Sequence, residues 1–452
     1  MATDHEPHTS SPVEIVAHLP IRGERRAREA LMITDSALRE QALIAIPPRI
    51  LSDPDHAGFR LALACARADR PATDGAIRNA AAEIVDWTGV LQVIRRHRIA
   101  GLAHHALARL KCDMPAAPRR ALAMHAMAQA RCSLALASEA FRLADAFAEA
   151  RIPLAFLKGP VLSHQLHGDL GRRHSRDLDL IVAPADRNTA AALLEGLGYR
   201  PVKGLDLAAA DGWTRSLNEW EYRHPQSQIV VELHWRFCPN RRLAEPLSRF
   251  ATWDDIALGG GRTLRTLTGE SLAAYLCLHG SLHAWSRLKW LADLDTLLAA
   301  QGPEAPERLL VFAGRTRLTR PIALGLTLAQ TLLDTPLHED VRRQLAADAT
   351  VRSLGRTALA AMRTGKGGVE LEETRFGSTR VRLSHFRLGR GWRHWWAQAI
   401  AAMSSAEDRA AVRLPPALSC LYPLLRPVLW ALRRAPRIPS RSAPHDDGSG
   451  RR

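Results

Sequence analysis

The stretch that decides the fold runs from Leu154 to Val182 and reads LAFLKGPVLSHQLHGDLGRRHSRDLDLIV. Its first four residues are apolar and predict a strand, which ends at Lys158-Gly159. Pro160 follows and can open a helix at its first position. A basic loop then leads into a second apolar run at 177–182. The stretch therefore predicts a strand, a tight turn, a short helix, a loop and a second strand.

Two carboxylates lie on that second strand. Because side chains alternate faces along a strand, Asp177 and Asp179 point the same way, while the leucines beside them point into the core. A later run, VVELHW, carries a single acid, Glu232, on one face with Val230 and His234. Carboxylates that repel each other need a cation between them, and oxygen ligands of this kind suit Mg²⁺. The sequence predicts a metal site at Asp177, Asp179 and Glu232.

The order of these motifs resembles the DNA polymerase β-like nucleotidyltransferase superfamily, and in particular its bacterial uncharacterised nucleotidyltransferase family. LKG at 157–159, HGDLGRRHSRDLDLIV at 167–182, VELHW at 231–235 and LHGSLHAWSRLKWLADL at 278–294 carry the likeness, which covers roughly residues 58–435. A D-x-D pair alone is a weak signal, whereas the ordered set is specific. The resemblance implies an α+β fold, with a small mixed-sheet nucleotidyltransferase core between N- and C-terminal all-helical regions.

The same resemblance implies an Mg²⁺-dependent enzyme that moves an NMP group from an NTP to an acceptor and releases pyrophosphate. Two Mg²⁺ ions would lie on the three carboxylates, and Glu232 would also help to deprotonate the acceptor hydroxyl. The acceptor is not readable; a sugar, a peptide natural product and a protein are the classes that the likeness suggests.

Several residues are candidates for binding the nucleotide. The backbone of Gly159 would cradle phosphate oxygens, as turns before helices do. The side chains of Lys158, Arg172, Arg173 and Arg176 would pair with phosphates, although solvated positions are an equal interpretation for such a loop.

A second group of nucleotide-binding candidates lies on two later helices. His279 and His283 share a helix face, with Lys289 nearby in the block that resembles the family. The two histidines are also compatible with plain helix packing. Zinc is not predicted there, because the metalloprotease motif needs Glu where Gly280 stands.

The chain has 452 residues and a formal net charge of +16, which attracts polyanions such as nucleotide phosphates or anionic lipid. Its six cysteines form no C-x-x-C pair, and the polar N-terminus has no signal-peptide pattern, so a cytoplasmic protein is expected. No motif indicates a specific nucleic acid.

The expected organisation is a mobile extension at 1–50, a helical domain at 51–150, the α/β core at 151–240, a helical domain at 241–375 and a basic, Trp-rich segment at 376–452.

Peripheral membrane contact through the C-terminal segment is a further expectation. FRLGRGWRHWW at 386–396 mixes arginine with tryptophan, and the apolar run at 414–434 is broken by prolines and is too interrupted to span a bilayer. Packing on the protein's own helices is the competing interpretation.

Two other functions remain open at this level. A kinase-like phosphotransferase on the same fold would move the γ-phosphoryl group instead. A non-catalytic protein would use the basic surface to bind nucleic acid or anionic lipid, but a binder of anions has no use for three acids in one pocket.

Overall fold

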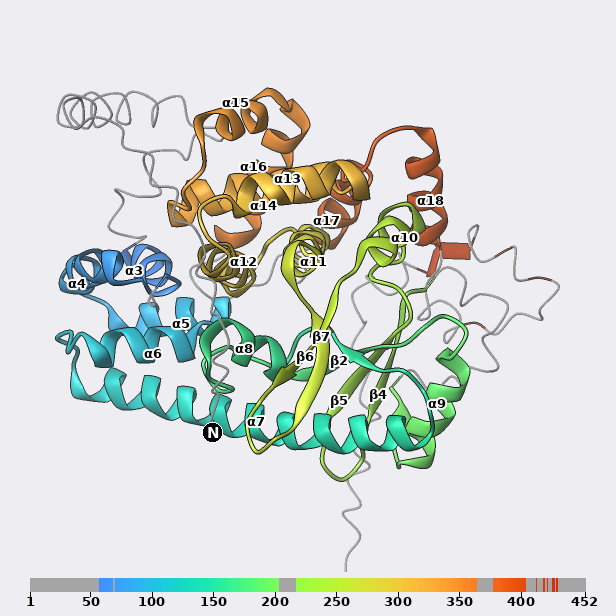
Figure 1. The fold of residues 1–452 in the computed structure, drawn as a ribbon. Coiled ribbons are helices and arrows are strands. Elements are labelled where there is room, and N and C mark those ends of the chain that lie inside the picture. The colour runs from blue at the N-terminus through green and yellow to red at the C-terminus, as the bar shows by residue number, and fades with distance from the viewer. Residues whose placement is uncertain are drawn as a thin grey trace, which may run out of the picture.

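The computed structural model describes residues 57–67, 70–202, 217–363 and 377–403, with a few single positions between 412 and 429 (Figure 1). The predicted N-terminal extension at 1–50 and most of the apolar run at 414–434 lie outside these residues. No helix among the described residues is long and apolar enough to cross a membrane.

A seven-stranded mixed sheet forms the centre of the α+β fold, as predicted. Its spatial order is β3-β4-β5-β2-β1-β7-β6. The β2–β5 and β1–β7 pairs are parallel and the other pairs are antiparallel. The strands are β1 (Ala155–Phe156), β2 (Asp177–Ile181), β3 (Arg200–Pro201), β4 (Glu219–Arg223), β5 (Val230–His234), β6 (Trp253–Ala257) and β7 (Thr263–Leu267).

The hairpin of β6 and β7 was not expected, because helices were predicted to resume directly after residue 240. A helix does begin there, α10 (Arg241–Phe250), but the chain then returns to the sheet. β7 lies parallel to β1, with Thr266 opposite Phe156. The threonine hydroxyl also donates to the Phe156 carbonyl at 2.7 Å. This pairing joins residues 110 positions apart, so a local pattern does not reveal it.

Helices at the N-terminal side support one edge and one face of the sheet. They are α3 (Ala57–Cys65), α4 (Asp74–Ala82), α5 (Trp87–His97), α6 (Ala100–Arg109) and α7 (Ala116–Glu149), with a short 3₁₀ turn at Pro71–Thr73. Within the expected helical domain, α4 and α5 are separate helices, because Asp86 caps α5 by accepting from the N–H groups of Thr88 and Gly89. The long α7 runs beneath the strands (Figure 1).

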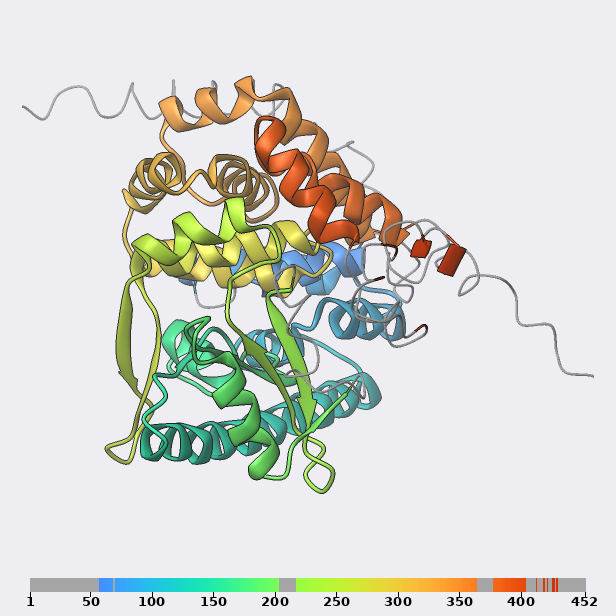
Figure 2. The ribbon, with the colours of Figure 1, turned by 90° about the vertical axis from the view of Figure 1, so that its right-hand side faces the viewer.

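Two helices connect strands of the sheet, and a helical layer covers its other side. α8 (Pro160–His167) and α9 (Arg187–Gly196) follow β1 and β2. The layer above the sheet holds the later helices (Figure 2). These are α11 (Gly269–Leu282), α12 (Leu288–Ala300), α13 (Ala305–Thr316), α14 (Thr319–Leu333), α15 (Glu339–Ala347), α16 (Ala349–Arg363), α17 (Gly377–His385) and α18 (Trp392–Met403).

Candidate functional site

The central strands place three acidic residues at one edge of the core. In the β2–β5 register, Asp179 lies opposite Glu232 and Asp177 lies opposite Val230. The alternate residues Leu178 and Leu180 are fully buried in the core. This alternation confirms the expected strand faces, and it directs the acids into a cavity of about 500 Å³ between the sheet and the helical layer.

The turn between β1 and α8 borders the same cavity. Gly159 has φ +75° and ψ −149°, a backbone conformation that L side chains rarely adopt. Pro160 follows at the first helical position, as predicted. The turn points Lys158 back across the sheet, so that its Nζ lies 2.7 Å from Oδ1 of Asp179. Lys158 and Gly159 both line the cavity.

The tightest group of potential metal ligands consists of Asp179, Glu232 and His234, whose ligand atoms lie within 4.8 Å of one another. Nε2 of His234 is 3.4 Å from Asp179 Oδ1 and 3.4 Å from Glu232 Oε2, while its Nδ1 is 3.1 Å from Glu219 Oε2. Asp177 lines the cavity but does not belong to this group. His234 was missed as a site residue, although its spacing from Glu232 placed it on the same strand face.

The charges of this cluster depend on one another. Burial opposes the charged form of Asp179, but the Lys158 ammonium and the His234 imidazole hold its pKa well below the usual value. Burial also raises the pKa of Glu232 to about 7, with repulsion from Asp179 and Glu219 adding to the shift. Burial works against a charged His234, yet Glu219, Asp179 and Glu232 raise its pKa to about 10. The carboxylate of Asp179 is therefore stabilised by two positive groups of the chain itself, the Lys158 ammonium and the His234 imidazolium.

These donors fit a hard divalent ion. Oxygen atoms of Asp179 and Glu232 converge, and Asp177 stands two residues before Asp179 on the same strand, which is the carboxylate-rich set that Mg²⁺ takes together with substrate phosphates. Nε2 of the buried His234 lies 3.4 Å from an oxygen of each of the Asp179 and Glu232 carboxylates, so the imidazole stands beside the oxygen ligands as a positive partner.

A basic wall borders the cavity and is formed by Arg98 after α5, Arg173 on the loop before β2 and Lys289 on α12. Nε of Arg173 donates to both carboxylate oxygens of Asp293 at 2.9 Å, and both side chains are buried. Nζ of Lys289 donates to the His174 carbonyl at 3.3 Å. Burial, reinforced by the charges of Arg173 and Arg98, pushes the pKa of Lys289 well below its usual value. This wall of Arg98, Arg173 and Lys289 thus concentrates positive charge around one buried acid.

An aromatic wall lies beside the basic one. The rings of His279 and His283 are 4.6 Å apart, and His283 stacks on Trp290 at 5.0 Å with an interplanar angle of 30°. Burial lowers the pKa of His283 to about 3 and that of His279 well below its usual value, with Lys158 adding to both shifts. Both imidazoles are therefore neutral near pH 7, so they present flat surfaces and not positive charges.

Most of the predicted site residues line this one cavity. They are Lys158, Gly159, Asp177, Asp179, Glu232, His279, His283 and Lys289. Of the three loop arginines proposed to bind phosphates, Arg173 is among the described lining residues, whereas Arg172 and Arg176 are not. The reason is the path of the loop: the Gln129 side chain donates to the carbonyls of residues 171 and 172, which leaves Arg173 to turn inward onto Asp293.

Comparison with known proteins agrees with this geometry. A family model described as "Uncharacterised nucleotidyltransferase" matches residues 83–334, more than half of the chain, which therefore belongs to this family. No curated protein and no solved structure matches the chain. The matched region contains the turn at Gly159, both acidic strands and the basic and aromatic walls.

Proposed function

Because the chain belongs to a nucleotidyltransferase family, we propose that it transfers an NMP group from an NTP to an acceptor, with Mg²⁺ bound by Asp177, Asp179 and Glu232. The observation that carries the proposal is the parallel register that sets Asp179 opposite Glu232, beside the Lys158-Gly159 turn, in a cavity large enough for a nucleotide. Divalent ions bound there would neutralise phosphate charge and stabilise the attacking and leaving oxygens.

The chain's own groups supply the remaining parts of such a reaction. An acceptor hydroxyl oxygen bonds to the α-phosphorus while the bond from that phosphorus to the bridging oxygen breaks, and pyrophosphate leaves. Glu232, which lies opposite Asp179 on the neighbouring strand, would help to take up the hydroxyl proton. Lys158 is held beside Asp179 and reaches the phosphates from the sheet side.

Lys289 and the basic wall would receive the triphosphate tail from the helical side. Burial beside Arg173 and Arg98 disfavours the ammonium form of Lys289, and a polyanion placed against this wall would remove that repulsion. Neutral His279, His283 and Trp290 would face the flat, uncharged part of the nucleotide, because aromatic surfaces stack on bases. The acceptor is a sugar, a peptide or a protein hydroxyl.

Isotope transfer tests the reaction. Purified protein with Mg²⁺, a cell extract as the source of acceptor, and NTPs labelled at the α or the γ phosphorus should give α-label transfer and free pyrophosphate. Asp179→Asn and Asp177→Asn should abolish it, whereas Asp255→Asn on exposed β6 should not. Transfer of γ-label would establish a kinase instead.

Metal binding gives a readout that does not need the acceptor. Calorimetric titration with Mn²⁺ should show binding to the wild type and a loss of at least about tenfold in affinity for Asp179→Asn, because one charged ligand is removed. Equal Mn²⁺ affinity in the wild type and in this variant would refute the assignment of the metal ligands.

A further inference from the structure

Helix α18 presents an aromatic face to solvent. Trp392, Trp396 and Ile400 are four residues apart and so share one face of the helix. Their exposed fractions are 74%, 63% and 45%, and Trp395 beside them is 57% exposed. The opposite face of the same helix packs inward, where Gln398 is buried. Exposed indole rings in such a group mark an interaction surface more often than chance.

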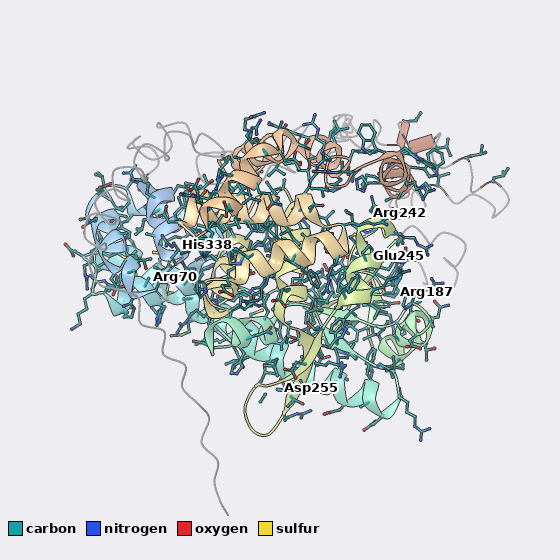
Figure 3. All side chains as sticks on the ribbon, turned by 45° about the horizontal axis from the view of Figure 1, so that its top comes forward. Arg70, Arg187, Arg242, Glu245, Asp255 and His338 are labelled. Atoms are coloured by element: carbon teal, nitrogen blue, oxygen red, sulfur yellow. The ribbon has the colours of Figure 1, made fainter. Side chains whose placement is uncertain are left out.

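A basic hollow of about 270 Å³ adjoins this aromatic face. Four arginines line it with Trp392, and none of its described lining residues is acidic. The four are Arg242, Arg317, Arg390 and Arg393. Arg242 comes from α10, with Glu245 one turn further along that helix (Figure 3). Arg390 is paired with Asp348 at 3.0 Å. The other three arginines give the hollow its excess of positive charge.

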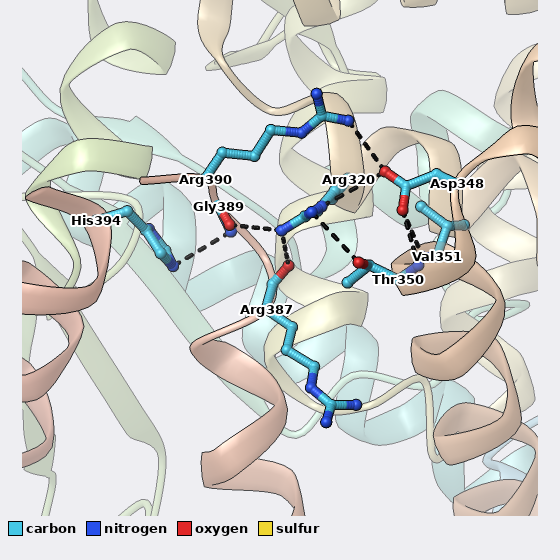
Figure 4. Close-up of polar contacts among 8 residues, drawn as sticks. All are labelled: Arg320, Asp348, Thr350, Val351, Arg387, Gly389, Arg390 and His394. Carbon is cyan, nitrogen blue, oxygen red and sulfur yellow. Dashed lines mark hydrogen bonds and ion pairs between the residues drawn. The ribbon is translucent and has the colours of Figure 1, made fainter. Parts of the chain in front are cut away.

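The loop that enters α18 is held in place by Arg320 of α14 (Figure 4). Nη1 of Arg320 donates to the carbonyl oxygens of Arg387 and Gly389, at 3.0 and 2.7 Å. A side chain at Gly389 would clash, because an added Cβ would lie 2.3 Å from the His394 ring. The hollow and the first turn of α18 are therefore positioned by bonds to the α14 helix and do not depend on a ligand.

We propose that the outward face of α18 and the adjoining hollow form a docking surface for an anionic lipid bilayer. Phosphate-bearing headgroups would enter the hollow, while Trp392 and Trp396 would lie at the level of the headgroups, where indole rings are favoured. An amphipathic helix with basic residues at its border lies along such a surface without crossing it. Each arginine adds attraction to the negative surface potential.

A second copy of the chain fits this surface less well. A symmetric contact would place the same patch against itself, and that arrangement would bring the arginines of both hollows together. An anionic bilayer would bind both residue types at once. Its charged headgroups would pair with the arginines, and the adjacent apolar boundary would receive the tryptophan rings.

Vesicle flotation tests the proposal with the full-length protein. We expect it to float with phosphatidylcholine vesicles that contain about 30% phosphatidylglycerol, to float poorly with phosphatidylcholine alone, and to be released as salt rises. Arg242→Gln/Arg393→Gln should lower the partition coefficient about 25-fold, at about fivefold for each arginine. Trp392→Ser/Trp396→Ser should lower it by about tenfold or more.

The controls remove equivalent groups elsewhere. Arg265→Gln on β7 removes one positive charge at an exposed position, half the change in the arginine pair variant, and Met124→Ser removes an exposed apolar side chain from α7. Both should float as the wild type does, and circular dichroism should show that every variant is folded.

Four outcomes would overturn the lipid surface. These are absence of flotation with either vesicle, equal flotation of the arginine pair variant and the wild type, a dimer in light scattering that the tryptophan variant loses, and binding of soluble phosphate or of an oligonucleotide in the hollow without vesicle binding.

Discussion

Replacement of Asp293 by asparagine tests how the basic wall is held. Asp293 lies on α12 and accepts two charge-assisted hydrogen bonds, both at 2.9 Å, from Nε of Arg173, with each side chain about 3% exposed. Two unit charges at such a distance attract each other by about 6 kcal/mol at an effective dielectric constant of about 20. Loss of one partner from a buried pair typically costs about 3–5 kcal/mol, because the other charge stays buried without compensation.

We therefore expect Asp293→Asn to lower the free energy of unfolding by about 3–5 kcal/mol, measured by urea denaturation followed through tryptophan fluorescence. The double variant Arg173→Met/Asp293→Leu is the matched control, because it removes both charges and keeps the side-chain volume. It should recover most of the lost stability. A single variant within about 1 kcal/mol of the wild type, or a double variant no more stable than the single, would refute the reasoning.

Two further changes have clear expected outcomes. Gly101→Ala should destabilise the protein by about 1–3 kcal/mol in the same urea assay, since its Cβ would lie 2.3 Å from the Arg172 carbonyl oxygen, whereas Gly314→Ala, with no atom within 4 Å, should be neutral or stabilising. Burial lowers the pKa of His97 from 6.5 to about 3, and Arg96 adds to the shift. The unfolded chain therefore takes up this proton first, so the stability from neutral His97 is complete above about pH 6.5 and falls by about 1.4 kcal/mol per pH unit below it. His97→Gln should lose less stability than the wild type between pH 7.5 and 5.5, and equal losses would contradict the assignment.

The sequence predicts the acidic strands because their signals are local. The alternation in DLDLI and VVELH assigns Asp177, Asp179 and Glu232 to strand faces without knowledge of the partner strand. The parallel register that sets Asp179 opposite Glu232 was not predicted, since 53 residues separate the two positions. The same alternation also placed His234 on the strand face of Glu232, but His234 was not assigned to the site from the sequence.

The basic loop was harder to predict, because contacts with distant segments decide which arginine turns inward. Arg173 is selected by Asp293 on α12 and by the Ser163 hydroxyl, which accepts from its backbone N–H at 3.1 Å. Arg172 is displaced because its backbone packs against Gly101 on α6, where no Cβ intervenes. Neither partner is visible in the local sequence, so three neighbouring arginines look equivalent there.

The distribution of charge across the cavity connects the fold to the proposed chemistry. The sheet side presents Asp179 and Glu232 with Lys158 beside Asp179, while the opposite wall presents Lys289 of α12 and Arg173 of the loop before β2. A polyanion alone would be repelled by the acids, and a divalent ion alone would leave the basic wall uncompensated. A nucleotide triphosphate carrying its metal would satisfy both sides together, because the metal would neutralise the acids while the phosphate tail would meet the cations. This two-sided requirement supports nucleotidyl transfer over a binder of anions, for which the buried acids would only weaken binding.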